Sequence, residues 1–244
     1  MRATIVLILA GCSGGSGEWV VETWGEEYIE DEIPAETFAD GCSVRYDSFV
    51  VAFSARELVD GNGDVAGALA PDEAFDVHEA GPTAMGVVDV PADHYDTVRV
   101  VVAPGSAAGM DGQSVRAVGA LTCGSVSAAF DWAFDESTTY TCGPPDLTIP
   151  TGGSDRTQLT VHGDHLFYDG LEDADAAVRG QAILDADADG NGDISMAELD
   201  AVSIPALGYG VGEYSDVLTL REFVSHLSRT LIHVDGEAEC TVDF

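Results

Sequence analysis

The feature that most restricts the possible folds of this chain is a series of short apolar segments between residues 43 and 162. Each segment is rich in Val, Phe or Tyr and alternates in part between apolar and polar residues, which is the period of a β-strand. Gly, Pro and Asp clusters separate the segments, without a helical period between them. We predict a mainly β chain with an antiparallel β-sandwich over residues 41–168. The predicted strands are 43–54, 84–90, 95–103, 114–123, 126–134 and 157–162.

One turn of this region is specified by its own residues. The segment Asp60-Gly61-Asn62-Gly63-Asp64 places Asn-Gly between two apolar runs, which is the strongest short signal for a β-hairpin. The same five residues recur at 189–193, within a candidate metal-binding loop. However, Leu58 and Leu69 stand at the positions where such a loop needs acids, so we predict a turn.

The charge of the chain excludes several classes of function. The 244 residues carry 44 acidic and 9 basic side chains, a formal net charge of −35, and every basic residue is Arg. An acidic surface repels phosphate backbones, so we predict that the protein does not bind nucleic acid. Without Lys, the chain has no P-loop lysine and cannot form a lysine Schiff base. The charge fits either the attraction of cations or adaptation to high salt.

The N-terminus has the features of an export signal. Arg2 precedes an apolar run over residues 3–10, which is too short to span a bilayer and ends in Leu-Ala-Gly-Cys at Cys12. This segment resembles the lipobox of bacterial lipoproteins. The resemblance implies that residues 1–11 are a signal peptide and that Cys12 carries the lipid. The protein would then lie in the cell envelope, periplasmic or surface-exposed, held to a bacterial membrane by that lipid.

Residues 12–40 are expected to form a lipidated acidic tether. Ser and Gly dominate its start, and eight carboxylates without a base follow between residues 18 and 36. Trp19 and Trp24 are interleaved with these acids. An edge strand that docks through its aromatic side chains is therefore the alternative, and we expect partial ordering.

Four cysteines remain once Cys12 is assigned to lipid. An even number in an exported chain predicts two disulfides, with three possible pairings. We favour Cys123–Cys142, which would close a short loop between neighbouring strands. That choice leaves Cys42–Cys240, which would tie the start of the sandwich to residues 233–244. We expect these last residues to return to the sandwich as a strand.

The strongest chemical motif is residues 187–198, which read Asp-Ala-Asp-Gly-Asn-Gly-Asp-Ile-Ser-Met-Ala-Glu. Ca²⁺ is a hard cation that takes about six to eight oxygen ligands in a flexible cage, and this stretch offers oxygens on alternate residues. Gly192 permits a sharp turn. Apolar residues at helical spacing precede and follow the loop, at 178–186 and 199–202. The predicted metal ligands are Asp187, Asp189, Asn191, Asp193, Ser195 and Glu198.

This loop resembles that of the EF-hand family, and the resemblance covers residues 172–232 approximately. It implies side-chain ligands at the first three positions, the backbone carbonyl of Asp193, direct or water-mediated binding by Ser195, and both carboxylate oxygens of Glu198. It also implies a helical EF-hand module over residues 169–232 with Ca²⁺ as its cofactor. In the family, the residue at the position of Ile194 forms a short β-bridge with a partner loop.

EF-hands usually pair, so a second hand is expected after the first. Residues 211–222 keep the frame in part, with Leu218 at position 8 and Glu222 at position 12. Val211 replaces the first acid, and we interpret the segment as a degenerate hand that binds no calcium. The alternative is an ordinary amphipathic helix that starts near Leu220.

Two histidines support a different metal. Copper and zinc prefer imidazole ligands, and His162 and His165 follow a predicted strand. Residues i and i+3 of a strand face opposite sides, so this pair could bind one ion only if Gly163 bends the chain. The other histidines, among them His233, lie elsewhere in the sequence. Periplasmic binding of copper or zinc is therefore an alternative function, and ordinary histidines at a sheet edge are the simpler interpretation.

No catalytic arrangement stands out in the sequence. It has no Ser-His-Asp order, no HExxH and no Gly-rich nucleotide loop. Asp131, Asp135 and Glu136 could supply the paired carboxylates of a hydrolase, but their spacing does not single them out. We predict a calcium-binding lipoprotein without enzymatic activity, in which the ion has a structural role.

Overall fold

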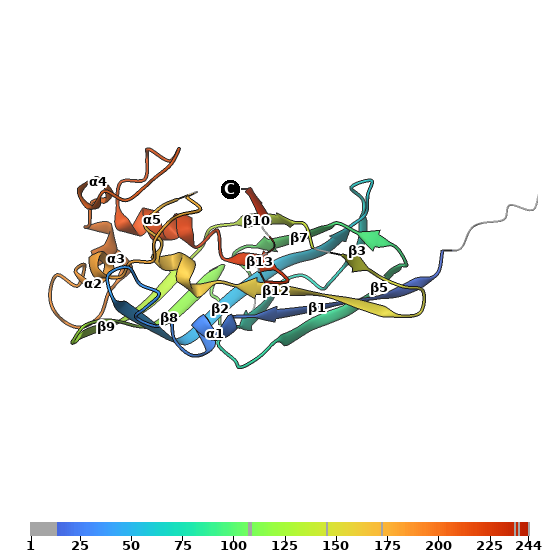
Figure 1. Ribbon diagram of the computed structural model, residues 1–244, viewed down its shortest axis with the longest axis horizontal. Helices are drawn as coiled ribbons and strands as arrows, with labels where there is room; N and C mark the ends of the chain where they lie inside the picture. The colour runs from blue at the N-terminus through green and yellow to red at the C-terminus, as the bar shows by residue number, and fades with distance from the viewer. Residues whose placement is uncertain are drawn as a thin grey trace, which may run out of the picture.

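In the computed structural model, β-strands outnumber helices by far, and the short helices gather at one end of the sheets (Figure 1). The prediction of a mainly β fold is confirmed. The structure describes residues 14–106, 109–144, 146–171, 173–236, 238 and 240–243. The predicted signal peptide and the predicted lipidation site, Cys12, lie outside the described residues.

The larger sheet is antiparallel and has the strand order β14-β10-β7-β2-β8-β9. Its longest strand, β2, also pairs with two short strands, β3 and β4. The strands are β2 (Cys42–Val59), β3 (Val65–Ala68), β4 (Glu73–Asp76), β7 (Thr97–Val102), β8 (Val115–Cys123), β9 (Val126–Phe134), β10 (Thr138–Cys142) and β14 (Cys240–Asp243).

The smaller sheet has the order β13-β12-β1-β5 and contains one parallel pair, β1 with β12. All other pairs between the described strands are antiparallel, as predicted. Its strands are β1 (Ser16–Trp24), β5 (Thr83–Pro91), β12 (Ser154–Val161) and β13 (Ile232–Val234). Two further short strands, β6 (His94–Tyr95) and β11 (Leu147–Thr148), pair with each other.

Strand β1 corrects the expectation of an acidic tether over residues 12–40. It lies inside the smaller sheet, between β12 and β5, rather than at an edge. Its residues alternate, so that Trp19 and Val21 are buried while Glu18 is exposed. The Trp19 indole also donates a hydrogen bond to Thr157 Oγ1 of β12, at 2.9 Å. The buried apolar face therefore orders the strand despite its carboxylates.

The predicted strands all contribute to these sheets, and the predicted Asn-Gly turn is confirmed. It joins β2 to β3, which pair as an antiparallel hairpin. The Asp60 carboxylate accepts hydrogen bonds from the backbone N–H groups of Asn62 and Asp64, both at 2.9 Å. These bonds stabilise the turn.

A continuous hydrophobic core connects the two sheets and the helices. Tyr46 of β2 illustrates the connection, because its hydroxyl donates to the carbonyl of Gly163, directly beyond β12, at 2.7 Å. On β9, the rings of Phe130 and Trp132 stack with centroids 4.4 Å apart. Trp132 is fully buried, so the two rings form a packed apolar platform on the larger sheet.

The two disulfides are Cys42–Cys123 and Cys142–Cys240, so the pairing that we favoured is wrong. Each bridge joins residues that lie directly opposite each other on neighbouring antiparallel strands: β2 with β8, and β10 with β14. Cys123 and Cys142 cannot meet because β7 and β2 lie between β8 and β10 in the sheet. Cysteines that are close in the sequence therefore need not lie on neighbouring strands of this sheet.

The helices are short, and they replace the longer helices expected on either side of the loop at 187–198. They are α1 (Glu26–Glu30), the 3₁₀ helix η1 (Gly163–Phe167), α2 (Gln181–Leu184), α3 (Met196–Asp200), α4 (Ile204–Leu207) and α5 (Leu220–Leu227). The amphipathic helix expected near Leu220 is α5, which buries Leu220, Phe223, Val224 and Leu227. In the described part of the chain, every helix is too short to cross a membrane.

Candidate metal centres

The first candidate centre is the loop between α2 and α3. Its turns are built by the side chain of Asp187, which accepts the backbone N–H groups of Asn191 at 3.1 Å and Gly192 at 2.9 Å. Gly192 has φ +82°, a left-handed conformation that glycine adopts without a steric cost. The side chain of Asn191 in turn accepts the N–H of Asp193 at 2.7 Å. The predicted loop register therefore matches a compact, internally bonded turn.

Three of the six predicted ligands converge. One carboxylate oxygen from each of Asp187, Asp189 and Glu198 lies within 4.8 Å of the others. Three negative charges at this spacing repel one another, and a divalent cation would offset the repulsion. Of the remaining predicted ligands, Asn191 and Asp193 are exposed on the same loop, and Ser195 is half-buried.

The loop is attached to strand β9 rather than to a second metal loop. Ile194 is fully buried, and its N–H donates to the carbonyl of Ala129 at 2.7 Å. The N–H of Ala129 donates to the carbonyl of Gly192 at 2.9 Å. The indole of Trp132 donates to the carbonyl of Ile194 at 2.9 Å. The bridge expected between Ile194 and a partner loop is thus made to the sheet.

Both sides of the loop are held in place by caps. The carboxylate of Asp40, just before β2, accepts the N–H groups of Gly180 and Gln181, both at 2.9 Å, where α2 begins. On the other side, Ser195 and Glu198 form a reciprocal capping box at the start of α3. Hydrogen bonds at the starts of α2 and α3 therefore hold the segments on both sides of the loop.

The segment at 211–222 has a different structure from the first loop. Glu222 forms a capping box with Thr219 at the start of α5, in the same way as Glu198 with Ser195. However, Leu218 is 55 % exposed, and its carbonyl accepts the N–H of Ile204 rather than bonding to the first loop. The two segments share a helix start, and a loop-to-loop bridge between Ile194 and Leu218 is not formed.

The second candidate centre is a group of histidines, and it includes one that the sequence did not connect to the others. Strand β12 ends at Val161 and the chain turns into η1, so His162 and His165 lie on the same side, with ring centroids 5.2 Å apart. Gly163 makes this bend possible, because a Cβ there would lie 2.7 Å from Ile29 and 2.8 Å from Tyr46. The ring of His233, on β13, lies 4.5 Å from that of His162.

The same turn brings a carboxylate to the histidines. Ligand atoms of His162, Asp164 and His165 lie within 4.8 Å of one another, and all three residues are buried. Burial raises the pKa of Asp164, while the nearby His162 opposes that rise. Burial, followed by the charges of His162 and His233, lowers the pKa of His165 to about 3. His165 is therefore neutral at neutral pH.

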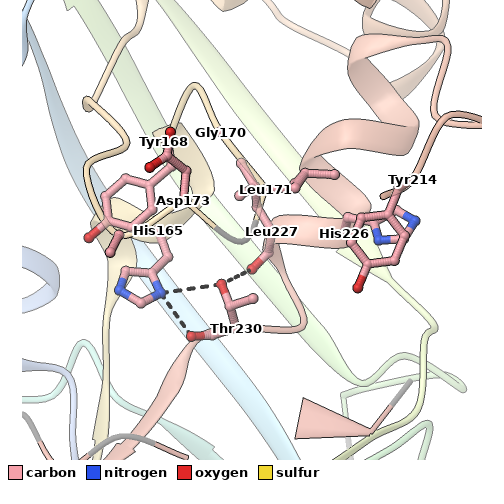
Figure 2. Close-up of a pocket in the computed structure, with 10 residues that line it drawn as sticks. His165, Tyr168, Gly170, Leu171, Asp173, Tyr214, His226, Leu227 and Thr230 are labelled. Carbon is pink, nitrogen blue, oxygen red and sulfur yellow. Dashed lines mark hydrogen bonds between the residues drawn. The ribbon is translucent and has the colours of Figure 1, made fainter. Parts of the chain in front are cut away.

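His165 also lines a pocket of about 220 Å³, shown in Figure 2. The walls come from η1, the segment after it, the loop before α5, and α5 itself, and they include Tyr168, Leu171, Tyr214 and Leu227. The ring of His165 stacks against Tyr168 at 4.6 Å, and its Nδ1 contacts the carbonyl of Thr230 at 2.8 Å. The pocket therefore opens beside the histidine group.

The carboxylates considered for a hydrolase lie on and after β9. Asp131 forms a two-bond ion pair with Arg116 at 2.9 and 2.7 Å, and this pairing lowers the pKa of Asp131. Glu136 accepts the backbone N–H of Asp135 at 3.1 Å. The Asp131 carboxylate is therefore held in an ion pair with the Arg116 guanidinium.

Comparisons with known proteins do not add to this geometry. No protein-family model, curated protein or solved structure matches the chain. The residues of the two centres are therefore the basis for any functional proposal.

Proposed function

We propose that the protein binds one Ca²⁺ ion in the loop formed by residues 187–198. The observation that carries this proposal is the convergence of carboxylate oxygens from Asp187, Asp189 and Glu198 within 4.8 Å, on the register that the motif requires. Asn191, the carbonyl of Asp193, and Ser195 would complete an oxygen cage, which is the environment that Ca²⁺ prefers. The net charge of −35 favours the approach of any cation.

The loop would act as a single EF-hand-like site attached to a β-sheet. Its short flanking helices and its bridge to β9 distinguish it from a pair of hands that open and close. A bound ion would fix α2 and α3 against the platform formed by Phe130 and Trp132. We therefore infer a structural role, for which an affinity of about 10⁻⁴–10⁻³ M suffices in a calcium-rich compartment.

We further propose that the protein is a lipid-anchored component of the bacterial cell envelope. The two disulfides support a location outside the reducing cytoplasm. The lipid would be attached to Cys12 after removal of residues 1–11. Mass spectrometry of the mature N-terminus tests this proposal: an acylated Cys12 supports it, and an intact residue 1 contradicts it.

Thermal unfolding of the full chain with and without Ca²⁺ tests the calcium proposal. Ligand at about 100 times Kd stabilises the native state by about 2.7 kcal/mol, so the melting temperature should rise. Glu198→Gln should abolish the rise, because it removes the ligand that closes the cage. The matched control is Glu222→Gln, which disturbs the equivalent capping box of α5 and should leave the rise unchanged.

Two outcomes contradict the proposal. One is a calcium-induced rise in melting temperature that persists in Glu198→Gln. The other is the absence of a rise in the unaltered chain at millimolar Ca²⁺. An equal loss in both variants would point to helix capping, rather than metal binding, as the role of the two glutamates.

A further inference from the structure

The histidine group has the composition of a site for a transition metal, distinct from the calcium loop. Its members come from two neighbouring strands and the turn beside them: His162 and His165 near the end of β12, and His233 on β13. The three imidazole rings lie 4.5 to 5.3 Å apart, centroid to centroid. Ligand atoms of His162, Asp164 and His165 lie within 4.8 Å of one another, and the ring of His233 lies beside them.

Two of these side chains are buried with polar atoms that lack a partner. His162 and Asp164 are each 8 % exposed. Within the described residues, His162 Nε2 and Asp164 Oδ1 have no hydrogen-bond partner. Burying such an atom without a partner costs about 1–3 kcal/mol, and native proteins rarely leave it so. A ligand between these two atoms would remove that cost.

The outer nitrogen of His165 is hydrogen-bonded, and that of His162 faces a carboxylate. The carbonyl of Thr230 can only accept, so His165 Nδ1 carries the proton of their 2.8 Å bond and Nε2 keeps its lone pair. His162 Nδ1 lies 3.7 Å from a carboxylate oxygen of Glu26, which favours a proton on Nδ1 there too. Such outer partners set the tautomer of histidine ligands.

We propose that His162, His165, His233 and Asp164 bind one divalent transition-metal ion of the class of Zn²⁺ or Cu²⁺. Three imidazoles suit these borderline metals, whereas Ca²⁺ takes oxygen ligands. The pocket in Figure 2 lies on the other side of His165, where Nδ1 contacts Thr230. This inference does not depend on the calcium proposal, because the two centres share no residue.

The test is a titration of the full chain with Co²⁺, a spectroscopic substitute for Zn²⁺, in the presence of millimolar Ca²⁺. A Cys12→Ser background removes the only cysteine outside the disulfides. We expect one equivalent of Co²⁺ to bind and to give visible d–d absorption. This absorption should disappear when Zn²⁺ displaces the bound Co²⁺. His162→Gln and His233→Gln should each weaken binding by more than the roughly 10-fold that loss of an outer partner can cost.

Two variants serve as matched controls. His94→Gln changes an exposed histidine that contacts Thr148 on the small β6–β11 pair, and Glu198→Gln disables the calcium loop. Both should bind Co²⁺ like the parent. Failure to bind Co²⁺, or unchanged binding by His162→Gln, overturns the proposal and leaves three packed histidines. Loss of binding in Glu198→Gln alone would assign the ion to the loop instead.

A measurement on the unaltered chain guards against variants that do not fold. Copper-bound protein should show nitrogen hyperfine structure in its electron paramagnetic resonance spectrum, because imidazole nitrogens would be the main ligands. A spectrum with oxygen ligands only contradicts the proposal.

Discussion

At the scale of single residues, Ile194 connects the candidate calcium loop to the β-sheet. Its side chain is fully buried, and its backbone bonds to both Ala129 and Trp132. Ile194→Ala should lower the free energy of unfolding by about 2–5 kcal/mol through the lost apolar contacts and the cavity left behind. Chemical denaturation in the absence of Ca²⁺ measures this change.

The conservative variant Ile194→Val separates packing from the backbone bridge. It should cost only about 0.5–1.5 kcal/mol and preserve calcium binding. A cost below 0.5 kcal/mol for Ile194→Ala, on the order of a surface substitution, would mean that the loop is not anchored on β9.

His226 of α5 should make stability depend on pH in a defined direction. Burial, followed by the charge of Arg229, lowers its pKa below the ordinary value. The unfolded chain then binds a proton that the folded chain resists, so stability is lost as pH falls through the ordinary histidine range, near 6.5. Unfolding should be compared at pH 7.5 and 5.5 in the parent and in His226→Gln, both with chelator.

The variant lacks this titration, so its stability relative to the parent should increase at the lower pH. A constant difference between the two proteins at both pH values would show that His226 titrates normally. An increase in the relative stability of the parent would mean that its pKa is raised.

The candidate sites were only partly predictable from residue patterns, for a physical reason. The proposed ligands Asp187 to Glu198 lie in one short stretch, and their spacing specifies the loop directly. The position of His233 beside His162 could not be inferred, because the two residues meet through the pairing of β12 with β13. Register between distant strands leaves no local signal. The bend at Gly163, in contrast, follows from the sequence as the condition under which His162 and His165 lie on the same side.

At the scale of elements, the two disulfides differ in their distance from the loop. Cys42–Cys123 links β2 to β8, near Asp40, whose carboxylate caps α2. Cys142–Cys240 links β10 to the C-terminal strand β14 at the opposite edge of the sheet. Removing either pair as Cys→Ala should lower stability by roughly 4–5 kcal/mol in the chain-entropy model.

Only the first removal should also weaken calcium binding, because the cap at Asp40 and the start of α2 lose their fixed position. Denaturation and a calcium titration of Cys42→Ala/Cys123→Ala and Cys142→Ala/Cys240→Ala provide the comparison. Equal calcium affinity in the two double variants would show that α2 does not need the bridge beneath it.

The strands themselves could be located from the sequence more readily than their neighbours in the sheet. Alternation and turn residues are local properties, which is why the strand positions and the turn at Asp60–Asp64 agree with the structure. Strand order depends on contacts between distant segments. This explains the incorrect pairing of the cysteines. The assignment of β1 to a tether has a different cause, because its carboxylates concealed the buried face formed by Trp19 and Val21.

At the scale of the whole molecule, the net charge of −35 attracts cations without any specific site. Loosely held ions of this kind also stabilise an acidic protein. Salt screens such interactions over distances of about 10 Å at 0.1 M and about 3 Å at 1 M. A chelating loop differs from this background, because its oxygens contact the ion directly.

The most direct test is therefore an isothermal calorimetric titration of the full chain with Ca²⁺ in about 1 M NaCl, where diffuse attraction is screened. We predict one saturable calcium site per chain in the parent and in Glu222→Gln, and none in Glu198→Gln. A parent chain without a saturable site, or a Glu198→Gln variant that retains it, would contradict calcium binding by residues 187–198.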